Sequence, residues 1–228
     1  MCRKVRVLSL VMAAIGFATL SACETTKQTP IDEFSTHEGL VRVEVKGIDA
    51  VYRKPKADLS KYNKLILPPV HIEFSKNWEK NLDSAMYRMN KPDREKIKSE
   101  LAEVFADVFK KELETKGQYQ IVTEPAEDTL EFQAAIINLY INAPDVSMQT
   151  AGRSKVYTTD AGEMTLVAEL HDSITGELLS RAYDRQQSVD SGTWQWTNSV
   201  TNTAEARRII GMWAETLHKA LDASRGKK

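Results

Sequence analysis

Cysteine is almost absent from this sequence of 228 residues, because its two cysteines, Cys2 and Cys23, both lie near the amino terminus. The chain after Cys23 therefore has no thiol for a disulfide, a zinc–thiolate site or a nucleophile. A chain of this size buries about 70% of its unfolded surface. It can therefore fold without disulfides.

Long apolar runs and excess basic charge are also missing. The run Val7–Leu20 is shorter than the ~20 residues of a comfortable membrane span, and no later run is long enough either. Of the 31 basic residues, three precede Cys23, so the chain from Cys23 onward has 28 basic residues against 32 acidic ones, a net charge of −4. This excludes a strongly basic surface, and we expect no nucleic-acid partner.

Common catalytic motifs do not occur. There is no G-x-S-x-G elbow, phosphate loop, G-x-G-x-x-G or H-E-x-x-H. The histidines lack metal-ligand spacing, and two of them, His71 and His171, fall in predicted strands, where a hydrogen-bonded or exposed histidine is the favoured interpretation. We therefore expect no catalytic residue, no metal site and no cofactor.

One acidic cluster could in principle bind calcium or act in hydrolysis. It consists of Asp172, Glu177, Asp184 and Asp190. Its spacing does not match the twelve-residue calcium loop, so a solvated hairpin surface is favoured. Paired carboxylates of a hydrolase remain an open alternative, because only their separation in space identifies them.

The amino-terminal segment has the pattern of an export signal: basic residues, a short apolar run and then small residues. Leu20-Ser21-Ala22-Cys23 resembles the lipobox of bacterial lipoproteins. The resemblance implies cleavage after residue 22, diacylglycerol on the Cys23 sulfur, and a further acyl chain such as palmitate on the new amino terminus. An ordinary signal peptide with a chance cysteine is the weaker alternative.

The rest of the chain divides into a tether and a domain. We expect residues 1–22 to be the cleaved signal, residues 23–38 a polar lipidated tether, and residues 39–225 a single globular domain. Acyl chains on Cys23 would hold this domain on a membrane. Glu24 follows the cysteine, where aspartate would favour the inner membrane, so we expect the periplasm-facing side of the outer membrane of a Gram-negative-type bacterium.

Hydrophobic periodicity predicts two long amphipathic helices. The first is striped by Ile97, Leu101, Val104, Phe105, Val108, Phe109 and Leu113. It has Gly117 at its carboxyl end. The second begins at Thr203 and is striped by Ile209, Ile210, Trp213, Leu217, Ala220 and Leu221.

Alternating residues predict strands around 40–46, 65–74, 119–122 and 128–142, and a hairpin over 164–187. In the 128–142 strand the apolar phase changes, which predicts a bulge near Ala134-Ala135 or cover on both faces of the strand. The predicted fold class is α+β. We expect a two-layer sandwich of a mainly antiparallel sheet with both long helices packed on one face.

Three segments resemble the bacterial lipoproteins labelled domain of unknown function 3313. They are ADLSKYNKLILPPVHI, LEFQAAIINL and HDSITGELLSRAYDR. The resemblance implies a lipoprotein and a fold, and it brings no catalytic residues with it. The Asp-Ser-x-Thr-Gly-Glu segment is sufficiently explained as a determinant of turn and register.

Trp194 and Trp196 form the one feature that folding does not fully explain. Two tryptophans two residues apart point the same way in an extended chain, and tryptophan is enriched at binding hot spots. They are candidate contacts for a partner or ligand; the alternative is that they cover the end of the core.

The leading functional hypothesis is a non-enzymatic, lipid-anchored envelope lipoprotein that docks onto an envelope protein partner as an accessory component of an assembly. The alternative is a module that binds a small ligand or the cell wall, and a hydrolase is less favoured. The sequence leaves the oligomeric state open.

Overall fold

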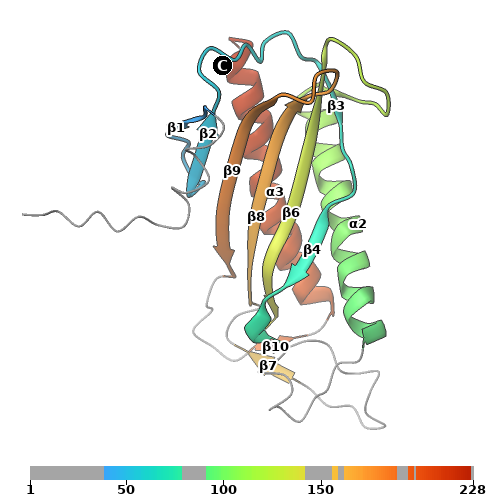
Figure 1. Ribbon diagram of the computed structural model, residues 1–228. Coiled ribbons are helices and arrows are strands. Elements are labelled where there is room, and N and C mark those ends of the chain that lie inside the picture. The colour runs from blue at the N-terminus through green and yellow to red at the C-terminus, as the bar shows by residue number, and fades with distance from the viewer. Residues whose placement is uncertain are drawn as a thin grey trace, which may run out of the picture.

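The computed structural model describes residues 39–78, 91–141, 156–158, 162–188, 195–197 and 199–226. At residues 156–158, 195–197 and 199–202 it describes the backbone alone. The elements are β1 (Val41–Val43), β2 (Ala50–Arg53), β3 (Lys64–Ile66), β4 (His71–Phe74), α2 (Lys91–Thr115), β5 (Gln120–Ile121), β6 (Thr129–Ile141), β7 (Val156–Thr158), β8 (Gly162–Asp172), β9 (Leu178–Gln187), β10 (Gln195–Thr197) and α3 (Ser199–Ser224). Figure 1 shows α2 and α3 behind one face of a long sheet.

Eight strands form one sheet in the order β1-β2-β9-β8-β6-β3-β5, and β4 also pairs with β6. The neighbours from β1 through β9 and β8 to β6 are antiparallel. By contrast β3 and β4 run parallel to β6, and β5 runs parallel to β3. The prediction of a mainly antiparallel sheet is therefore wrong for this half, and the sheet is mixed. The cause is α2, because a helix that connects two strands returns the chain to the same end of the sheet and leaves the strands parallel.

The apolar stripe predicted for the first helix is the buried side of α2. Its buried residues are Leu101, Val104, Phe105, Phe109 and Leu113. The ring of Phe109 packs between Phe105, at a centroid distance of 4.2 Å, and Phe132 of β6, at 5.1 Å. The helix is thus fixed to the sheet by aromatic contacts at its centre.

The end of α2 differs in detail from the prediction. The left-handed residue is Gln118, with φ 55°, and not Gly117. Glycine is nevertheless required at 117, because a Cβ there would lie 2.7 Å from Cδ2 of Tyr119 and 2.9 Å from the carbonyl oxygen of Leu113. A close approach, rather than a positive φ, explains this glycine.

The final helix, α3, also follows its predicted stripe, although it begins at Ser199 rather than Thr203. Ile209, Ile210 and Trp213 are all buried against the sheet. The packing role predicted from the helical stripe is therefore confirmed for these residues.

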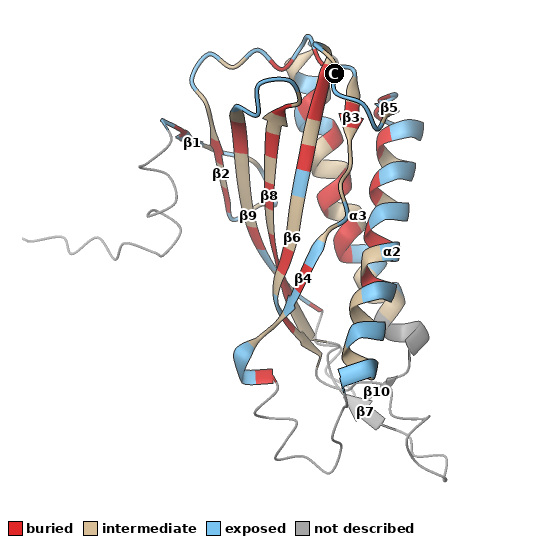
Figure 2. Cartoon of the chain, turned by 45° about the vertical axis from the view of Figure 1, so that its right-hand side comes forward, coloured by how far each residue is buried: buried red, intermediate tan, exposed pale blue. Residues whose placement is uncertain are grey.

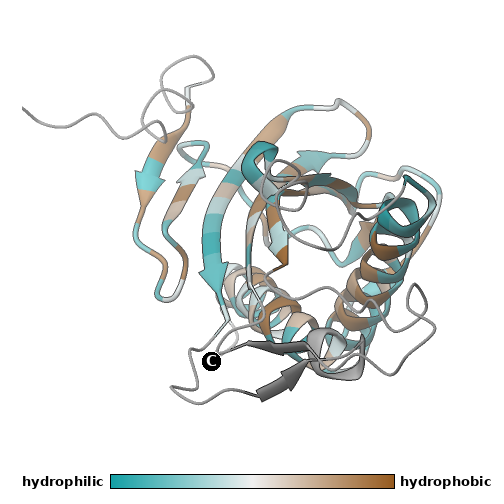
Figure 3. Ribbon diagram, turned by 90° about the horizontal axis from the view of Figure 1, so that it is seen from below, coloured by the Kyte–Doolittle hydropathy of each residue, from teal (hydrophilic) through white to brown (hydrophobic). Residues whose placement is uncertain are grey.

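The two faces of the sheet differ in polarity. Along β6, Leu130, Phe132 and Ile136 are buried on the helix side, while Gln133 is exposed. Figures 2 and 3 show that buried and apolar segments of sheet and helices turn towards one another. The predicted irregularity of β6 lies further along than Ala134-Ala135: the register shifts between Ile137 and Tyr140, around the left-handed Asn138. Asparagine tolerates this conformation better than other non-glycine residues.

In the part of the chain that the structure describes, no helix has both the length and the apolar character needed to cross a membrane.

Candidate functional site

A cavity of about 110 Å³ lies between α3 and the β1–β2 hairpin, above the helix-side face of β8 and β9. The hairpin wall includes Val43, Val45 and Val51, and the helix wall includes Trp213, Leu217 and Leu221. In Figure 1 the β1–β2 hairpin lies beside β9, and α3 lies behind the sheet. The cavity is concave and its lining is mostly apolar, which is the usual character of a ligand pocket.

The floor of this pocket is hollow because its side chains are small. Ala168 of β8 pairs with Ala182 of β9, and Ala182 pairs in turn with Val51 of β2. Two residues from Ala182 along β9, Ser180 is flanked by Leu170 and Arg53. Two adjacent alanines cannot fill the distance to α3, so a void remains where larger side chains would have closed the core.

A buried carboxylate joins the walls of the pocket. Asp184 has 1% of its surface exposed. Its Oδ2 accepts a hydrogen bond from Nε1 of Trp213 at 2.7 Å, and its Oδ1 accepts one from the backbone N–H of Asp49 at 3.0 Å. Asp184 therefore holds the loop before β2 and the middle of α3 to the same strand, and it has a structural rather than a free acidic role.

A second polar cluster supports the carboxyl-terminal end of α3. The Tyr62 hydroxyl donates to Oδ2 of Asp172 at 2.6 Å, while the N–H groups of Ile174 and Thr175 donate to Oδ1 at 3.0 and 2.9 Å. The Tyr62 hydroxyl, followed by the Thr175 N–H, holds the pKa of the Asp172 carboxyl well below its ordinary value. The guanidinium of Arg225 donates to the Tyr62 carbonyl at 2.6 Å.

This cluster explains the Asp-Ser-x-Thr-Gly-Glu segment. Gly176 has φ 70° and its N–H donates to the Asp172 carbonyl at 2.9 Å. Asp172 therefore closes the β8–β9 turn with its own side chain and fixes it to the loop that carries Tyr62. The interpretation of this segment as a turn and register determinant agrees with these contacts.

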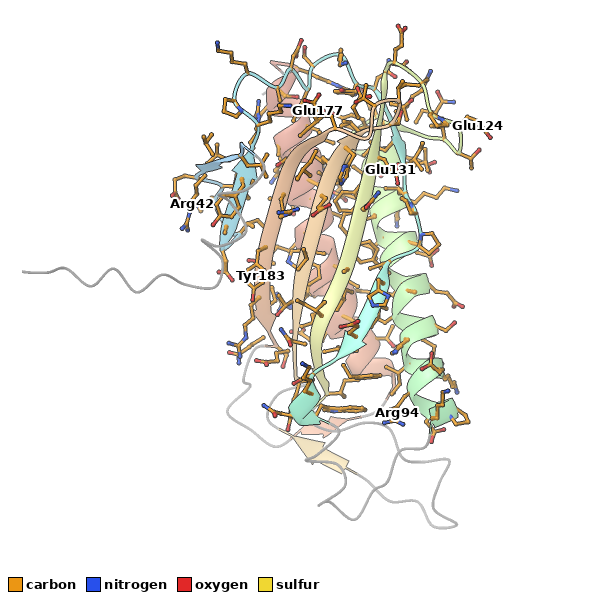
Figure 4. All side chains as sticks on the ribbon, in the orientation of Figure 1. Arg42, Arg94, Glu124, Glu131, Glu177 and Tyr183 are labelled. Atoms are coloured by element: carbon orange, nitrogen blue, oxygen red, sulfur yellow. The ribbon has the colours of Figure 1, made fainter. Side chains whose placement is uncertain are left out.

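The sheet face away from the helices carries charged pairs. Glu169 accepts a hydrogen bond from Nε of Arg181 at 2.7 Å and lies 2.9 Å from Nε2 of His171. Burial opposes ionisation of Glu169, but the hydrogen bonds from His171 and Arg181 outweigh it and lower its pKa. Figure 4 shows Glu131 and Tyr183 on strands of this same face. Glu169, His171 and Arg181 are thus paired with one another on this face.

The structure separates the acids that the sequence placed in one cluster. Asp172 closes the turn, Glu177 pairs with Lys54, and Asp184 binds Trp213. These three acids have different partners and do not converge. Asp190 lies outside the described residues.

Other predicted site residues are only partly covered. Cys23, Glu24 and Trp194 lie outside the described residues. The backbone of Trp196 belongs to β10, where it pairs with Tyr157 of β7. Both tryptophan contacts and the lipidation site therefore remain predictions.

The pocket itself is absent from the predictions made from sequence. The sequence feature that indicates the pocket is a pair of small residues, Ala168 and Ala182, at core-facing positions of β8 and β9 where larger apolar residues are usual. Each alanine alone is unremarkable, and only the register of β8 against β9 places them side by side. One further residue was also missed: Arg53, the one basic residue among the described residues that line the pocket.

Comparisons with known proteins give one family match. A family described as "Protein of unknown function (DUF3313)" matches residues 33–217. No curated protein matches the sequence.

Three solved structures are similar to the chain. A PelC dodecamer from Paraburkholderia phytofirmans has 12% identity and a TM-score of 0.39, covering 74% of this chain and 96% of that one. A minor lipoprotein from Acinetobacter baumannii has 14% identity and a TM-score of 0.32, with coverages of 72% and 95%. A Xanthomonas campestris protein with the family label DUF330 has 11% identity and a TM-score of 0.34, with coverages of 75% and 90%.

Because all three TM-scores are below 0.5, these structures say nothing about the function or assembly of this chain. The family match is different, because it spans most of the sequence and agrees with the resemblance of the three segments. The chain belongs to the DUF3313 family.

Proposed function

We propose that this protein is a non-enzymatic, lipid-anchored lipoprotein of the periplasm-facing outer membrane, and that its domain works by binding an apolar group in the pocket between α3 and the β1–β2 hairpin. The lipobox-like Leu20-Ser21-Ala22-Cys23 supports the anchor. The pocket is the observation that carries the binding role. A binding module was the alternative to partner docking at the level of sequence, and the pocket favours it.

The size of the pocket sets what it can hold. An apolar cavity of about 150 Å³ stays dry and binds benzene. A cavity of about 110 Å³ thus suits a group of a few carbon atoms or a segment of a longer chain. Burying about 100 Å² of apolar ligand surface contributes about 2.5 kcal/mol, so this pocket alone supports weak binding.

A membrane anchor makes weak binding useful. Lipid attached to Cys23 would confine the domain to the membrane surface, where ligands of the same membrane have a high effective concentration. The buried carboxylates Asp172 and Asp184 already bind protein partners, the Tyr62 hydroxyl and the Trp213 N–H. The proposed role therefore needs no reaction, cofactor or metal.

Benzene is the size-matched probe for this proposal. We would titrate it into the chain from residue 24 to 228, which includes every described residue, and follow methyl signals by NMR. Signals of Ala168, Ala182 and Leu217 should shift in a saturable way. No saturable shift at these methyl groups would reject the binding role.

Pocket-filling variants locate the site. Ala182→Leu adds volume to the pocket floor and should abolish the shifts. Ala135→Leu is its matched control, because Ala135 lies on the opposite face of the sheet, next to Val167. If Ala182→Leu fails to fold, Ala220→Leu at the helix wall tests the same point from an exposed position. Benzene shifts that survive either pocket variant would place binding elsewhere.

Docking onto an envelope protein is the second candidate, and one observation favours it. β1 ends the strand order of the described sheet, and Val41 on it is 49% exposed. Such an edge can accept an extended strand from a partner. In-cell crosslinking of the lipidated protein tests this, with Val41→Lys and the double variant Trp194→Ala/Trp196→Ala. A discrete partner band lost in either variant supports docking at that place, and the absence of any band rejects it.

A further inference from the structure

We infer that the ligand of this pocket is an anionic amphiphile, an acyl chain whose carboxylate or phosphate end binds Arg53. This inference rests on the proposed binding function and adds to it the chemical class of the ligand. It is carried by the position of one arginine that has no partner among the described residues, and by the apolar chemistry of the surrounding wall.

Arg53 faces the pocket because of strand alternation. It is the last residue of β2 and lies two positions after Val51, so both side chains project to the same face of the strand. Both line the pocket, and Arg53 pairs with Ser180 while Val51 pairs with Ala182. The side chain of Arg53 is half-buried.

The guanidinium of Arg53 has no hydrogen bond or ion pair with any residue in the described part of the chain. Neighbouring arginines on the sheet differ. Arg181 donates to Glu169 at 2.7 Å, and Arg185 pairs with Glu163. The planar donors of Arg53 are therefore open to a ligand, and they match a carboxylate or phosphate.

The other polar groups of the pocket are already engaged. The Ser180 hydroxyl donates to the Tyr52 carbonyl at 2.9 Å, and the Thr216 hydroxyl donates to the Met212 carbonyl at 2.9 Å. Glu169 borders the pocket, but its carboxylate binds Arg181 on the other face of the sheet. The pocket therefore offers a ligand apolar surface and one positive group that no described residue pairs with.

The helix wall of the pocket runs from Trp213 to Leu221, about 12 Å at the rise of an α-helix. β2 is antiparallel to β9, and Arg53 is its last residue and pairs with Ser180 near the start of β9. Arg53 therefore lies towards one end of the pocket floor. An apolar pocket with a cation towards one end fits a chain with a charged head. Only part of a long chain fits inside about 110 Å³, and the remainder would lie against the half-buried Val45 and Ile48.

Two sources supply this chemistry: a free fatty acid, or the acyl chain and phosphate of a membrane phospholipid. The first test compares dodecanoate with dodecanol, which share the chain and differ in charge. Using calorimetry on the chain from residue 24 to 228, we expect dodecanoate to bind at least about tenfold more tightly, the equivalent of about 1.4 kcal/mol.

Arg53 variants separate its charge from its aliphatic stem. Arg53→Met keeps the packing of the stem and should reduce the preference for dodecanoate to about onefold, while Arg53→Lys should retain most of it. Arg42→Met is the matched control, because Arg42 lies on β1 and already donates to the Asp49 carbonyl. The preference should be unchanged in this control.

The outcomes distinguish this inference from the function on which it rests. Equal affinity for dodecanoate and dodecanol, or a preference that survives Arg53→Met, overturns the anionic ligand even if benzene binds. Failure of benzene and of both amphiphiles overturns the binding function as well.

Vesicles identify the source. Phosphatidylcholine vesicles with and without phosphatidylglycerol are compared, using Arg53→Met as the reference. Arg53-dependent binding to the phosphatidylglycerol vesicles supports a phospholipid. Binding of dodecanoate without any Arg53-dependent vesicle binding supports a free fatty acid, and an absence of both overturns the inference.

Discussion

Tyr62→Phe tests whether the Tyr62–Asp172 hydrogen bond stabilises the fold. The change removes only the hydroxyl that donates to Oδ2 of Asp172 at 2.6 Å. Tyr62 is 2% exposed and Asp172 is 8% exposed, so water replaces the lost donor poorly. A hydrogen bond to a charged group contributes about 1.5–3 kcal/mol. For a domain of this size about 2 kcal/mol corresponds to a fall in Tm of about 4–8 °C.

The effect should depend on pH in one direction. The hydrogen bonds to Asp172 lower its pKa in the folded state. The resulting stability is complete above the unfolded pKa of about 3.9 and is lost as pH falls through the folded pKa. The difference in Tm between wild type and Tyr62→Phe should therefore be full at pH 5–7 and shrink below about pH 4.

Differential scanning calorimetry across this pH range is the assay, and Tyr119→Phe is the matched control. The Tyr119 hydroxyl lies 3.5 Å from Oδ1 of Asp222, at the limit of a hydrogen bond, so its loss should change Tm by less than about 2 °C. An unchanged Tm for Tyr62→Phe at pH 7, or a difference that widens on acidification, would refute the reasoning.

Three further predictions concern the frame and the anchor. Asp184→Ala should lower the free energy of unfolding by about 3 kcal/mol in urea titrations, because the buried N–H of Trp213 loses its acceptor; a loss below about 1 kcal/mol would contradict this. Trp78→Phe keeps the stacking on the core but removes the hydrogen bond from Nε1 to the Ile141 carbonyl at 2.8 Å, and should cost about 1 kcal/mol in the same titration. Cys23→Ser should remove the acyl mass in mass spectrometry and release the protein from the membrane fraction; an unchanged membrane fraction would argue against lipid anchoring.

Local patterns in the sequence were sufficient for several elements. The stripe around Phe105 and Phe109 predicts α2, and the stripe around Ile209 and Trp213 predicts α3, because an amphipathic period is a property of neighbouring residues. The alternation on either side of the turn at Gly176 predicts the β8–β9 hairpin for the same reason.

The pairing of strands that lie far apart in the sequence could not be predicted from local patterns. The period-two pattern around Leu65 is the same in a parallel and in an antiparallel sheet. It therefore does not predict the parallel pairing of Leu65 with Leu130. The irregularity of β6 was expected near Ala134-Ala135 and lies at Asn138, because the change of apolar phase indicates that a bulge exists but not which residue adopts the positive φ.

The sequence by itself determined the family, the two long helices, the main hairpin and the expectation of a lipid anchor at Cys23, since each of these is written in contiguous residues. Only the tertiary structure decided the mixed sheet and the pocket. Ala168, Ala182 and Arg53 are far apart in the chain, and they acquire a shared role only when the register of β2, β9 and β8 places them on one wall opposite α3. A cavity is a space between side chains, and no single segment encodes it.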